Sequence, residues 1–567
     1  MAEPSPGADV KVAAATDEGR PRPQPAVLID LGSRHHLFHD DGGTPFAAAS
    51  VGGRTAVLRV DGCDYAELLG REYYGLTGRG ASRNSISDAV ATLSAKAKYD
   101  GPKEPVFLRV APMADGIAID LGRDTSEAVA VTADGWRVSE APVRFIRASK
   151  SSALPRPVRA APCDFGLLWE HVNVAEADRV LVAAWLLAAL RPVGPYPIML
   201  LVGQQGTGKT STSRTLKRLT DPSVSPLRAP PRDTRDLLVA AVNSRVLAID
   251  NLSGASADLA DSLCRLSTGG ALSERRLFTN HEETLVEVQR PVILNGIDDP
   301  ATRPDLADRC LHVMLPPLGA RQTEMDLAAR FDADAPAIFG ALLDGLALAV
   351  RDHAKVRLNP LPRMADFATW AAAGLPALGF TADEFSSAYQ RNRAELLETA
   401  VDASPVASAL VRFMDTRDQW TGSSVDLLSL LSDGSASPAW PKSAKGLVGT
   451  LRRLAPALRS VGIEVSHRRE ISRNIIAVCK VGKDVPYAPY VPAARINDGA
   501  YGASDVPEPP YVPCENSVSG AYGAYGAYGA YGALKQTLHD GHGPAPCPRC
   551  AGEGCRFCRT GAGGPSR

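Results

Sequence analysis

The sequence predicts a multidomain α/β protein, and three observations support that prediction. At 567 residues the chain is too long for a single hydrophobic core. A strand, a glycine-rich loop and a helix follow one another between residues 197 and 219. Two further apolar runs end in polar residues near positions 250 and 295, in the alternating order that places a parallel sheet between helices. We therefore expect the central α/β domain at residues 164–325.

The chain before this core divides into three predicted segments. Residues 1–25 are rich in Pro, Ala and Gly and lack the apolar stretch of a signal peptide, so they predict a disordered tail. Residues 26–147 predict a small α/β domain with one helix at 85–96. Residues 148–163 contain Pro, Ser and basic side chains, which predicts a linker. The β-type runs of the small domain lie at 26–31, 55–60, 106–110, 116–121 and 128–132.

Charge, hydropathy and cysteine usage exclude some classes of protein. The net charge of -1 gives the whole chain no attraction to nucleic acid or to a membrane, so any binding patch must be local. The longest apolar run, 180–190, is well short of the ~20 residues that span a bilayer, and no membrane segment is expected. Six cysteines are scattered singly and four cluster near the end. This distribution suits a reducing cytoplasm and one metal site.

The glycine-rich loop has the spacing G-x-x-x-x-G-K-[ST]. Its glycines let successive backbone N–H groups turn inward to hold phosphates, Lys209 reaches the β- and γ-phosphates, and Thr210 ligates Mg²⁺. With a strand before it and a helix after it, the pattern predicts a P-loop NTPase that binds ATP with Mg²⁺; a chance glycine-rich turn is the alternative. The expected nucleotide contacts are Gly203, Gln204, Gln205, Gly206, Thr207, Gly208, Lys209, Thr210 and Ser211.

A second part of the site is expected where the apolar run 245–249 ends in Asp250. A carboxylate at the end of a parallel strand can hold Mg²⁺ from the side opposite the loop. A buried strand that ends in Asp at a turn is common. The motif therefore indicates a Mg²⁺ ligand because a P-loop precedes it.

Residues 168–317, with the P-loop and Asp250, resemble the superfamily III helicases and the related AAA+ ATPases of phages and integrative elements, including primase-helicase-like proteins. The resemblance implies a hexameric ring that hydrolyses ATP. It implies a polar sensor at Asn295, at the end of the run 291–294, where a buried strand ending in an Asn turn is the alternative. It also implies a β-hairpin at 272–288 that projects into the ring pore. The DNA contacts expected there are Arg275 and Arg276, unless this is an ordinary solvated hairpin.

Two further features follow from the resemblance. The segment 303–309 resembles the helix that offers an arginine finger to the neighbouring subunit, with Arg309 as the first choice and Arg303 as the second; a surface ion pair is the alternative. Many AAA+ members have Glu after the Walker B Asp, whereas this chain has Asn251. An amide orients water but is a poor base, so hydrolysis is expected to be slow.

After the core, the pattern predicts a helical bundle at 326–415 and a winged-helix domain at 416–482. The winged helix is read from helices at 424–431 and 444–460 followed by strands at 463–466 and 475–478. Residues 441–480 hold nine basic and two acidic side chains, a local net charge of +7. We expect them to bind DNA phosphates, or else to form a solvated face that packs on the ATPase. The expected DNA contacts are Lys445, Arg452, Arg453, Arg468, Arg469 and Arg473.

The end of the chain predicts a tether and a metal site. Residues 483–540 include a Gly-Ala-Tyr repeat and predict a low-complexity linker. Residues 541–567 hold two C-x-x-C pairs and predict a zinc knuckle that takes one Zn²⁺; disulfides or an unligated tail are the alternatives. The zinc ligands are Cys547, Cys550, Cys555 and Cys558.

Together these features predict a DNA-dependent ATPase, a helicase or translocase that replicates a phage or mobile element. The alternative is an ATP-switched DNA-binding regulator or initiator with little motor activity, which Asn251 favours. A P-loop phosphotransferase is a third reading, and the long basic region argues against it.

Overall fold

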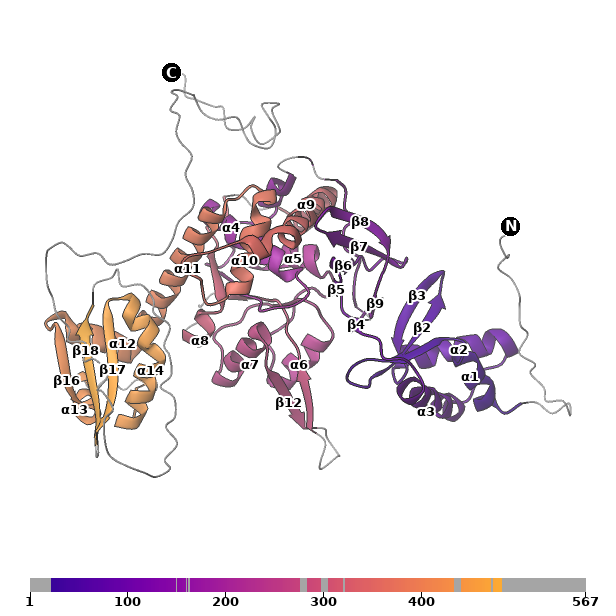
Figure 1. Cartoon of the computed structure of the whole chain (residues 1–567), viewed down its shortest axis with the longest axis horizontal. Helices are drawn as coiled ribbons and strands as arrows, with labels where there is room; N and C mark the ends of the chain where they lie inside the picture. The colour runs from indigo at the N-terminus through magenta and orange to yellow at the C-terminus, as the bar shows by residue number, and fades with distance from the viewer. Residues whose placement is uncertain are drawn as a thin grey trace, which may run out of the picture. The chain divides into compact units, whose positions relative to one another are not determined.

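The computed structural model describes residues 22–148, 150–159, 161, 164–275, 283–296, 304–319, 322–432, 440–470 and 473–481 (Figure 1). The chain divides into two compact units, Met1–Arg393 and Ala394–Arg567. The predicted tail up to residue 21, the tether from 483 and the cysteine pairs lie outside the described residues.

The first unit begins with three helices on a three-stranded antiparallel sheet. The run 26–31, predicted as a strand, is instead helix α1, which buries Val27, Leu28 and Leu31. Short apolar runs do not distinguish strand from helix by periodicity, which explains the error. Gly32 lets α1 approach its neighbours closely, because a Cβ there would lie 2.3 Å from Leu93 Cδ1. The elements are α1 Gln24–Gly32, β1 His36–His39, β2 Pro45–Val51, β3 Arg54–Arg59, α2 Cys63–Thr77 and α3 Arg83–Tyr99, with sheet order β1-β2-β3.

A four-stranded antiparallel sheet follows, and it belongs with the central core rather than with the small domain predicted at 26–147. Strands β7 and β8 pack against helix α9, and Ile119 and Val129 share a hydrophobic core with the central sheet (Figure 1). The predicted linker packs there too: Leu154 is buried and its N–H donates to Leu121 O at 2.8 Å. The strands of this sheet are β5 Val110–Met113, β6 Gly116–Asp120, β7 Glu127–Thr132 and β8 Gly135–Glu140. Strands β4 Val106–Phe107 and β9 Arg144–Phe145 form a separate parallel pair.

The central sheet has four parallel strands in the order β11-β14-β10-β15. Strands β10 and β14 are buried along their whole length, as expected for a parallel sheet covered on both faces. The three predicted strands are present, and β15 is additional. Helix α6 is capped by Asp233, whose side chain accepts from Asp236 N–H. The elements are η1 Asp164–Glu170, α4 Glu176–Ala189, β10 Ile198–Val202, α5 Lys209–Thr220, α6 Thr234–Val242, β11 Leu247–Ile249, α7 Ala257–Thr268, β14 Val292–Gly296, α8 Pro304–Ala307 and β15 Cys310–Met314.

The predicted hairpin at 272–288 is present as an antiparallel pair, β12 Ala271–Arg275 with β13 Glu283–Glu287. Figure 1 shows it extending beyond α6 and α7. Arg276 lies outside the described residues.

The predicted helical bundle at 326–415 is not one domain. Phe339 and Trp370 join the core of the central sheet, and Trp370 Nε1 donates to Leu187 O at 3.1 Å, whereas Leu410 and Met414 pack in the second unit. The segment Glu324–Lys355 is long and apolar enough to cross a membrane, but 61% of its apolar window is buried, as in a core helix. The elements are α9 Glu324–Asp352, η2 His353–Lys355, α10 Ala365–Gly374, η3 Leu375–Leu378 and α11 Ala382–Asp402, which runs on into the second unit.

The second unit packs three helices on a three-stranded antiparallel sheet of order β16-β18-β17. Both predicted helices are confirmed with the same bounds, and both predicted strands are present but longer. Strand β16 was not predicted because Gln419–Ser423 is short and polar. The elements are α12 Pro405–Asp415, β16 Gln419–Ser423, α13 Ser424–Leu431, α14 Ala444–Ser460, β17 Ile463–Glu470 and β18 Arg473–Lys480.

Candidate functional site

The loop 203–208 joins strand β10 to helix α5, and its shape depends on glycine. Gly206 and Gly208 have φ angles of 82° and 84°, in the left-handed region that other residues rarely adopt. Gly203 passes close to its neighbours, because a Cβ there would lie 2.8 Å from Thr207 Oγ1 and 3.0 Å from Leu315 O. The loop thus makes a tight turn that leads directly into the N-terminus of α5. Gln204 and Gln205 are exposed on it.

The Lys209 side chain folds back over this loop. Its ammonium donates to Gly203 O at 2.6 Å and to Gln204 O at 2.8 Å. Burial lowers the pKa of Lys209, and the nearby Asp250 carboxylate partly opposes that effect. The cation is therefore held at the mouth of the loop, beside the backbone N–H groups at the start of α5.

Four polar side chains meet at the carboxyl edge of the central sheet. Thr210 Oγ1 donates to Asp250 Oδ1 at 3.1 Å. Asn295 Nδ2 donates to the same Asp250 oxygen at 2.7 Å and to Ser213 Oγ at 2.9 Å. Neighbouring parallel strands end at the same edge, which brings Asp250, directly after β11, close to Asn295 of β14. The structure thus gathers the predicted residues and adds Ser213, one turn beyond Thr210 on the same helix face.

Asn251 holds a rare backbone conformation directly after Asp250. Its φ is 58°, which Asn tolerates better than most residues. Its N–H donates to Asn295 Oδ1 at 2.8 Å, and Asn295 Nδ2 donates to Asp250. The orientation of the Asn295 amide is therefore fixed by Asp250 and Asn251. Asn295 is 2% exposed, and its side chain bonds to Asp250, to Ser213 and to the Asn251 N–H.

Asn173 braces the loop from the other side, and sequence reasoning missed it. Its Nδ2 donates to Thr207 O at 2.9 Å and to Pro316 O at 2.6 Å. These bonds tie the loop to the segment after β15. No local motif surrounds Asn173, so only the three-dimensional contacts identify it.

Arg309 lies just after α8, and its side chain forms a hydrogen bond within the same short segment. Its Nη1 donates to Asp305 O at 2.6 Å, and its Nε is buried without a partner among the described residues. Arg303 lies outside the described residues. Arg309 O accepts from Ile198 N–H at the start of β10, so within one chain the structure does not bring Arg309 to the 203–210 loop.

The pairing of Thr210 and Asp250 fits Mg²⁺. This ion keeps several waters and takes few protein ligands alongside substrate phosphates. A hydroxyl and a carboxylate 3.1 Å apart at a phosphate-type loop form such a ligand set. The described part of the chain contains no group of three or more His, Cys, Asp or Glu side chains suited to a metal ion.

Helix α14 carries a basic face in the second unit. Leu447, Leu451 and Leu458 are buried on one side, whereas Lys445, Arg452 and Arg453 are exposed on the other. Arg468 on β17 is also exposed, and the side chains of Arg469 and Arg473 are outside the description. Arg459 pairs with Glu464 and is therefore neutralised.

Two family models match the chain. Residues 165–396 match the model described as "Actinomycete integrative conjugative element replication protein", and residues 406–486 match "AICE RepA C-terminal domain". These matches cover the central sheet with its polar network and the second unit with its basic helix. The protein is thus a replication protein of mobile genetic elements. In particular, it is a replication protein of an integrative conjugative element, and two of its regions match the AICE RepA models.

The similarity of this chain to solved structures is low. A structure titled "The A form apo structure of NrS-1 C terminal region-CTR" is 12% identical and covers 81% of this chain and 99% of its own, with a TM-score of 0.35. Another, "The apo structure of NrS-1 C terminal region (305-718)", is 11% identical and covers 81% and 98%, with a TM-score of 0.32. Likenesses at these scores define neither fold nor function. No curated protein sequence matches the chain.

Proposed function

We propose that this replication protein is a P-loop ATPase that binds ATP with Mg²⁺ and acts on DNA as a helicase or translocase. The observation that supports it most is the hydrogen-bonded network of Thr210, Asp250 and Asn295 at the mouth of a glycine loop that opens a helix. A phosphate-type loop, a carboxylate on the adjacent strand and a fixed amide are the parts that ATP hydrolysis uses.

Each side chain has a physical role in this proposal. The N–H groups of the loop and the positive end of α5 bind the phosphates, and the Lys209 ammonium neutralises the β- and γ-phosphates. Thr210 and Asp250 would hold Mg²⁺, which supplies charge neutralisation at the phosphates. Asn295 keeps the Asp250 carboxylate in place and can orient water. Asn251 supplies an amide where a carboxylate base would speed hydrolysis, so turnover is expected to be slow.

A ring would complete the site. Since Arg309 does not reach the loop of its own chain, the proposed arginine finger acts on the neighbouring subunit of a hexamer, where its guanidinium neutralises charge in the transition state.

The second unit supplies the proposed DNA contact. Helices α13 and α14 followed by the β17–β18 pair are the order of a winged helix, and α14 exposes its basic side chains. Replacing Arg452 and Arg453 with Glu is expected to weaken DNA binding about tenfold or more without changing ATP affinity, because phosphate contacts dominate DNA affinity. Fluorescence anisotropy at matched salt measures the first and titration with ATP the second. Unchanged DNA affinity would exclude α14 from the interface.

The C-terminal cysteine pairs are proposed to hold zinc. The purified full chain is expected to contain about one Zn²⁺ per chain, and a Cys547→Ser/Cys550→Ser variant none, because a Cys₄ site needs all four thiolates. Elemental analysis after dialysis under reducing conditions checks this. Equal zinc in the variant would place the metal elsewhere.

The alternative is an ATP-switched DNA-binding initiator with little motor activity. Asn251, at the position that follows the Mg²⁺ carboxylate, is the observation that favours it. An ATPase assay with and without DNA, followed by strand displacement on a forked substrate, separates the two. A motor shows DNA-stimulated turnover and strand separation. If DNA leaves turnover unchanged while ATP alters DNA affinity, the initiator is correct and the motor is discarded.

A further inference from the structure

The carboxylate of Asp221, just after helix α5, lies at the centre of a buried cluster of charges. Arg109 Nε donates to its Oδ1 at 3.2 Å, and Lys217 Nζ donates to its Oδ2 at 3.1 Å. Burial alone would raise the pKa of Asp221, but Lys217 and Arg109 outweigh it and lower the pKa to about 2. The carboxylate is therefore ionised at neutral pH and is already bonded within the protein.

A cavity of about 210 Å³ lies beside this cluster, and its wall is strongly basic. Five cationic side chains line it against two carboxylates, Asp120 and Asp221, a net charge of +3. Four serines, the Asn243 amide and a few apolar side chains line the remainder. The five cations are Arg109, Arg147, Lys150, Arg228 and Arg245.

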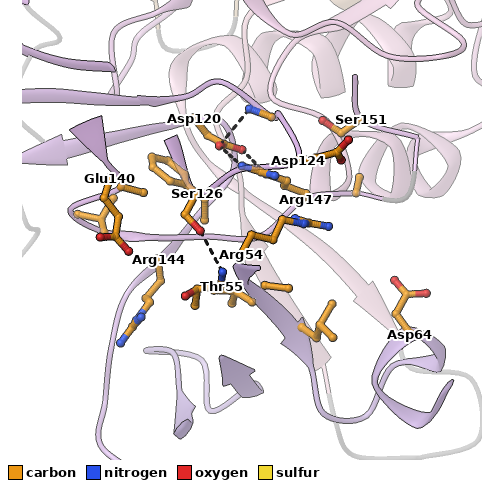
Figure 2. A pocket seen from close by; sticks show the side chains of 18 residues that line it. Arg54, Thr55, Asp64, Asp120, Asp124, Ser126, Glu140, Arg144, Arg147 and Ser151 are labelled. Atoms are coloured by element: carbon orange, nitrogen blue, oxygen red, sulfur yellow. Dashed lines mark hydrogen bonds and ion pairs between the residues drawn. The ribbon is translucent and has the colours of Figure 1, made fainter. Parts of the chain in front are cut away.

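Three of these cations are engaged inside the protein. Arg109 bonds to Asp221 and to main-chain carbonyls such as Ser152 O at 2.8 Å. Arg147 pairs with both oxygens of Asp120, at 2.8 Å and 2.6 Å, as Figure 2 shows. Arg245 is 3% exposed and donates to Tyr196 Oη at 2.9 Å. These guanidinium groups build the floor of the cavity.

The other two cations, Lys150 and Arg228, are exposed at the rim. Arg228 Nη2 donates to Ser244 Oγ at 3.0 Å, and within the described ranges neither cation pairs with a carboxylate. Both carboxylates in the wall are taken up by Arg109, Arg147 and Lys217. Among its described lining residues the cavity therefore has an excess of positive charge, which an external anion can balance.

We propose that this cavity binds a phosphate of a DNA backbone. Arginine, lysine, serine and asparagine are the side chains that contact DNA phosphates. A volume of about 210 Å³ is smaller than the ~300–1,000 Å³ of sites for whole small ligands, so it fits a phosphate group rather than a nucleotide. The site is separate from the 203–210 loop at the other end of α5.

The position of Arg228 favours DNA over free phosphate, and this step rests on the proposed function. Arg228 N–H donates to Ala248 O at 2.9 Å, and Arg228 O accepts from Asp250 N–H at 2.8 Å. DNA held by the Arg228 side chain is thus one backbone hydrogen bond from the residue proposed to hold Mg²⁺. A DNA-dependent ATPase needs such a connection between its two ligands.

A larger neighbouring cavity does not share this excess of positive charge. It measures about 320 Å³ and shares Arg147 and Ser151 with the basic cavity. Its wall holds three arginines but four carboxylates, Asp64, Asp120, Asp124 and Glu140, and Figure 2 shows these acids spread around it. With that balance it does not attract an anion.

The test is a Lys150→Ala/Arg228→Ala variant of the full chain, with Lys355→Ala/Arg357→Ala as the matched control. The control also removes one lysine and one arginine, but from an exposed segment after α9. Affinity for a fluorescent DNA oligonucleotide is measured over a salt series, and binding of ATP and of inorganic phosphate by titration. We expect about tenfold weaker DNA binding in the variant, with the slope of log affinity against log salt smaller by about 1, and no change in the control.

The outcomes separate the possible occupants. Unchanged DNA affinity and salt slope would overturn the proposal, and so would loss of inorganic phosphate binding with DNA binding intact, which would assign the cavity to free phosphate. ATP binding reports folding and the nucleotide site independently, since neither substituted residue contributes a side chain to the loop. A chain that binds DNA through this cavity but never binds ATP would refute the ATPase and leave the phosphate site standing.

Discussion

Replacing Lys209 with alanine is expected to lower ATP turnover by about 10²–10³-fold, the usual cost of removing one group that stabilises transition-state charge. Lys209 supplies the cation at the mouth of the glycine loop, where its ammonium lies 2.6 Å from Gly203 O. The loop geometry comes from glycines and from Asn173, so the variant is expected to fold. Phosphate release with saturating DNA measures the effect.

The matched control for this variant is Lys355→Ala, which removes one exposed lysine just after α9. It is expected to leave turnover unchanged, because exposed ion pairs contribute little. DNA affinity should be the same in both variants. Turnover in Lys209→Ala equal to that of the wild type would place hydrolysis outside this loop.

Removing the carboxylate of Asp221 is expected to have the largest effect on stability. Asp221 is 8% exposed, and its Oδ2 also accepts from the N–H groups of Arg245 and Val246 at 3.0 and 3.1 Å. Asp221→Ala leaves the buried cations Lys217 and Arg109 uncompensated, so the free energy of unfolding should fall by about 3–5 kcal/mol. Urea denaturation checks this, with Asp61→Asn as control, since that exposed pair with Arg59 contributes about 1 kcal/mol or less.

The same residue predicts a pH dependence. The pKa of Asp221 is lowered to about 2 in the folded protein, whereas an unfolded Asp titrates near ~4. The ionised carboxylate therefore stabilises the fold fully above about pH 4, and this stabilisation is lost as pH falls towards 2. The stability difference between the wild type and an Asp221→Asn variant should be constant from pH 5 to 7 and shrink below about pH 4. A difference that grows on acidification would contradict the buried ion cluster.

Much of the candidate site could be predicted because its chemistry follows local sequence. The spacing of Gly203, Gly208 and Lys209 fixes a turn between a strand and a helix, and polar residues at the ends of parallel strands meet at one edge. Asp250 and Asn295 are therefore foreseeable from the apolar runs before them. Ser213, Asn173 and Arg228 were not, because their roles come from contacts between segments distant in sequence.

Domain boundaries were less predictable for the same reason. The sheet of β5–β8 is covered by α9, whose residues lie roughly two hundred positions later in the chain. No local sequence pattern indicates that this helix packs on the sheet. Helix α1 was predicted as a strand because a run of six mostly apolar residues fits either period. In the second unit the bounds of α13 and α14 were predicted correctly; α14, for example, repeats its leucines at helical spacing and Ser443 caps it.

The central claim is tested most directly by equilibrium binding of ATP to the purified chain at millimolar Mg²⁺. Isothermal titration is expected to show one ATP per chain, with affinity reduced by chelating Mg²⁺ and by Asp250→Ala, because Asp250 and Thr210 lie 3.1 Å apart as a ligand pair. A folded protein that fails to bind ATP under these conditions would contradict the account.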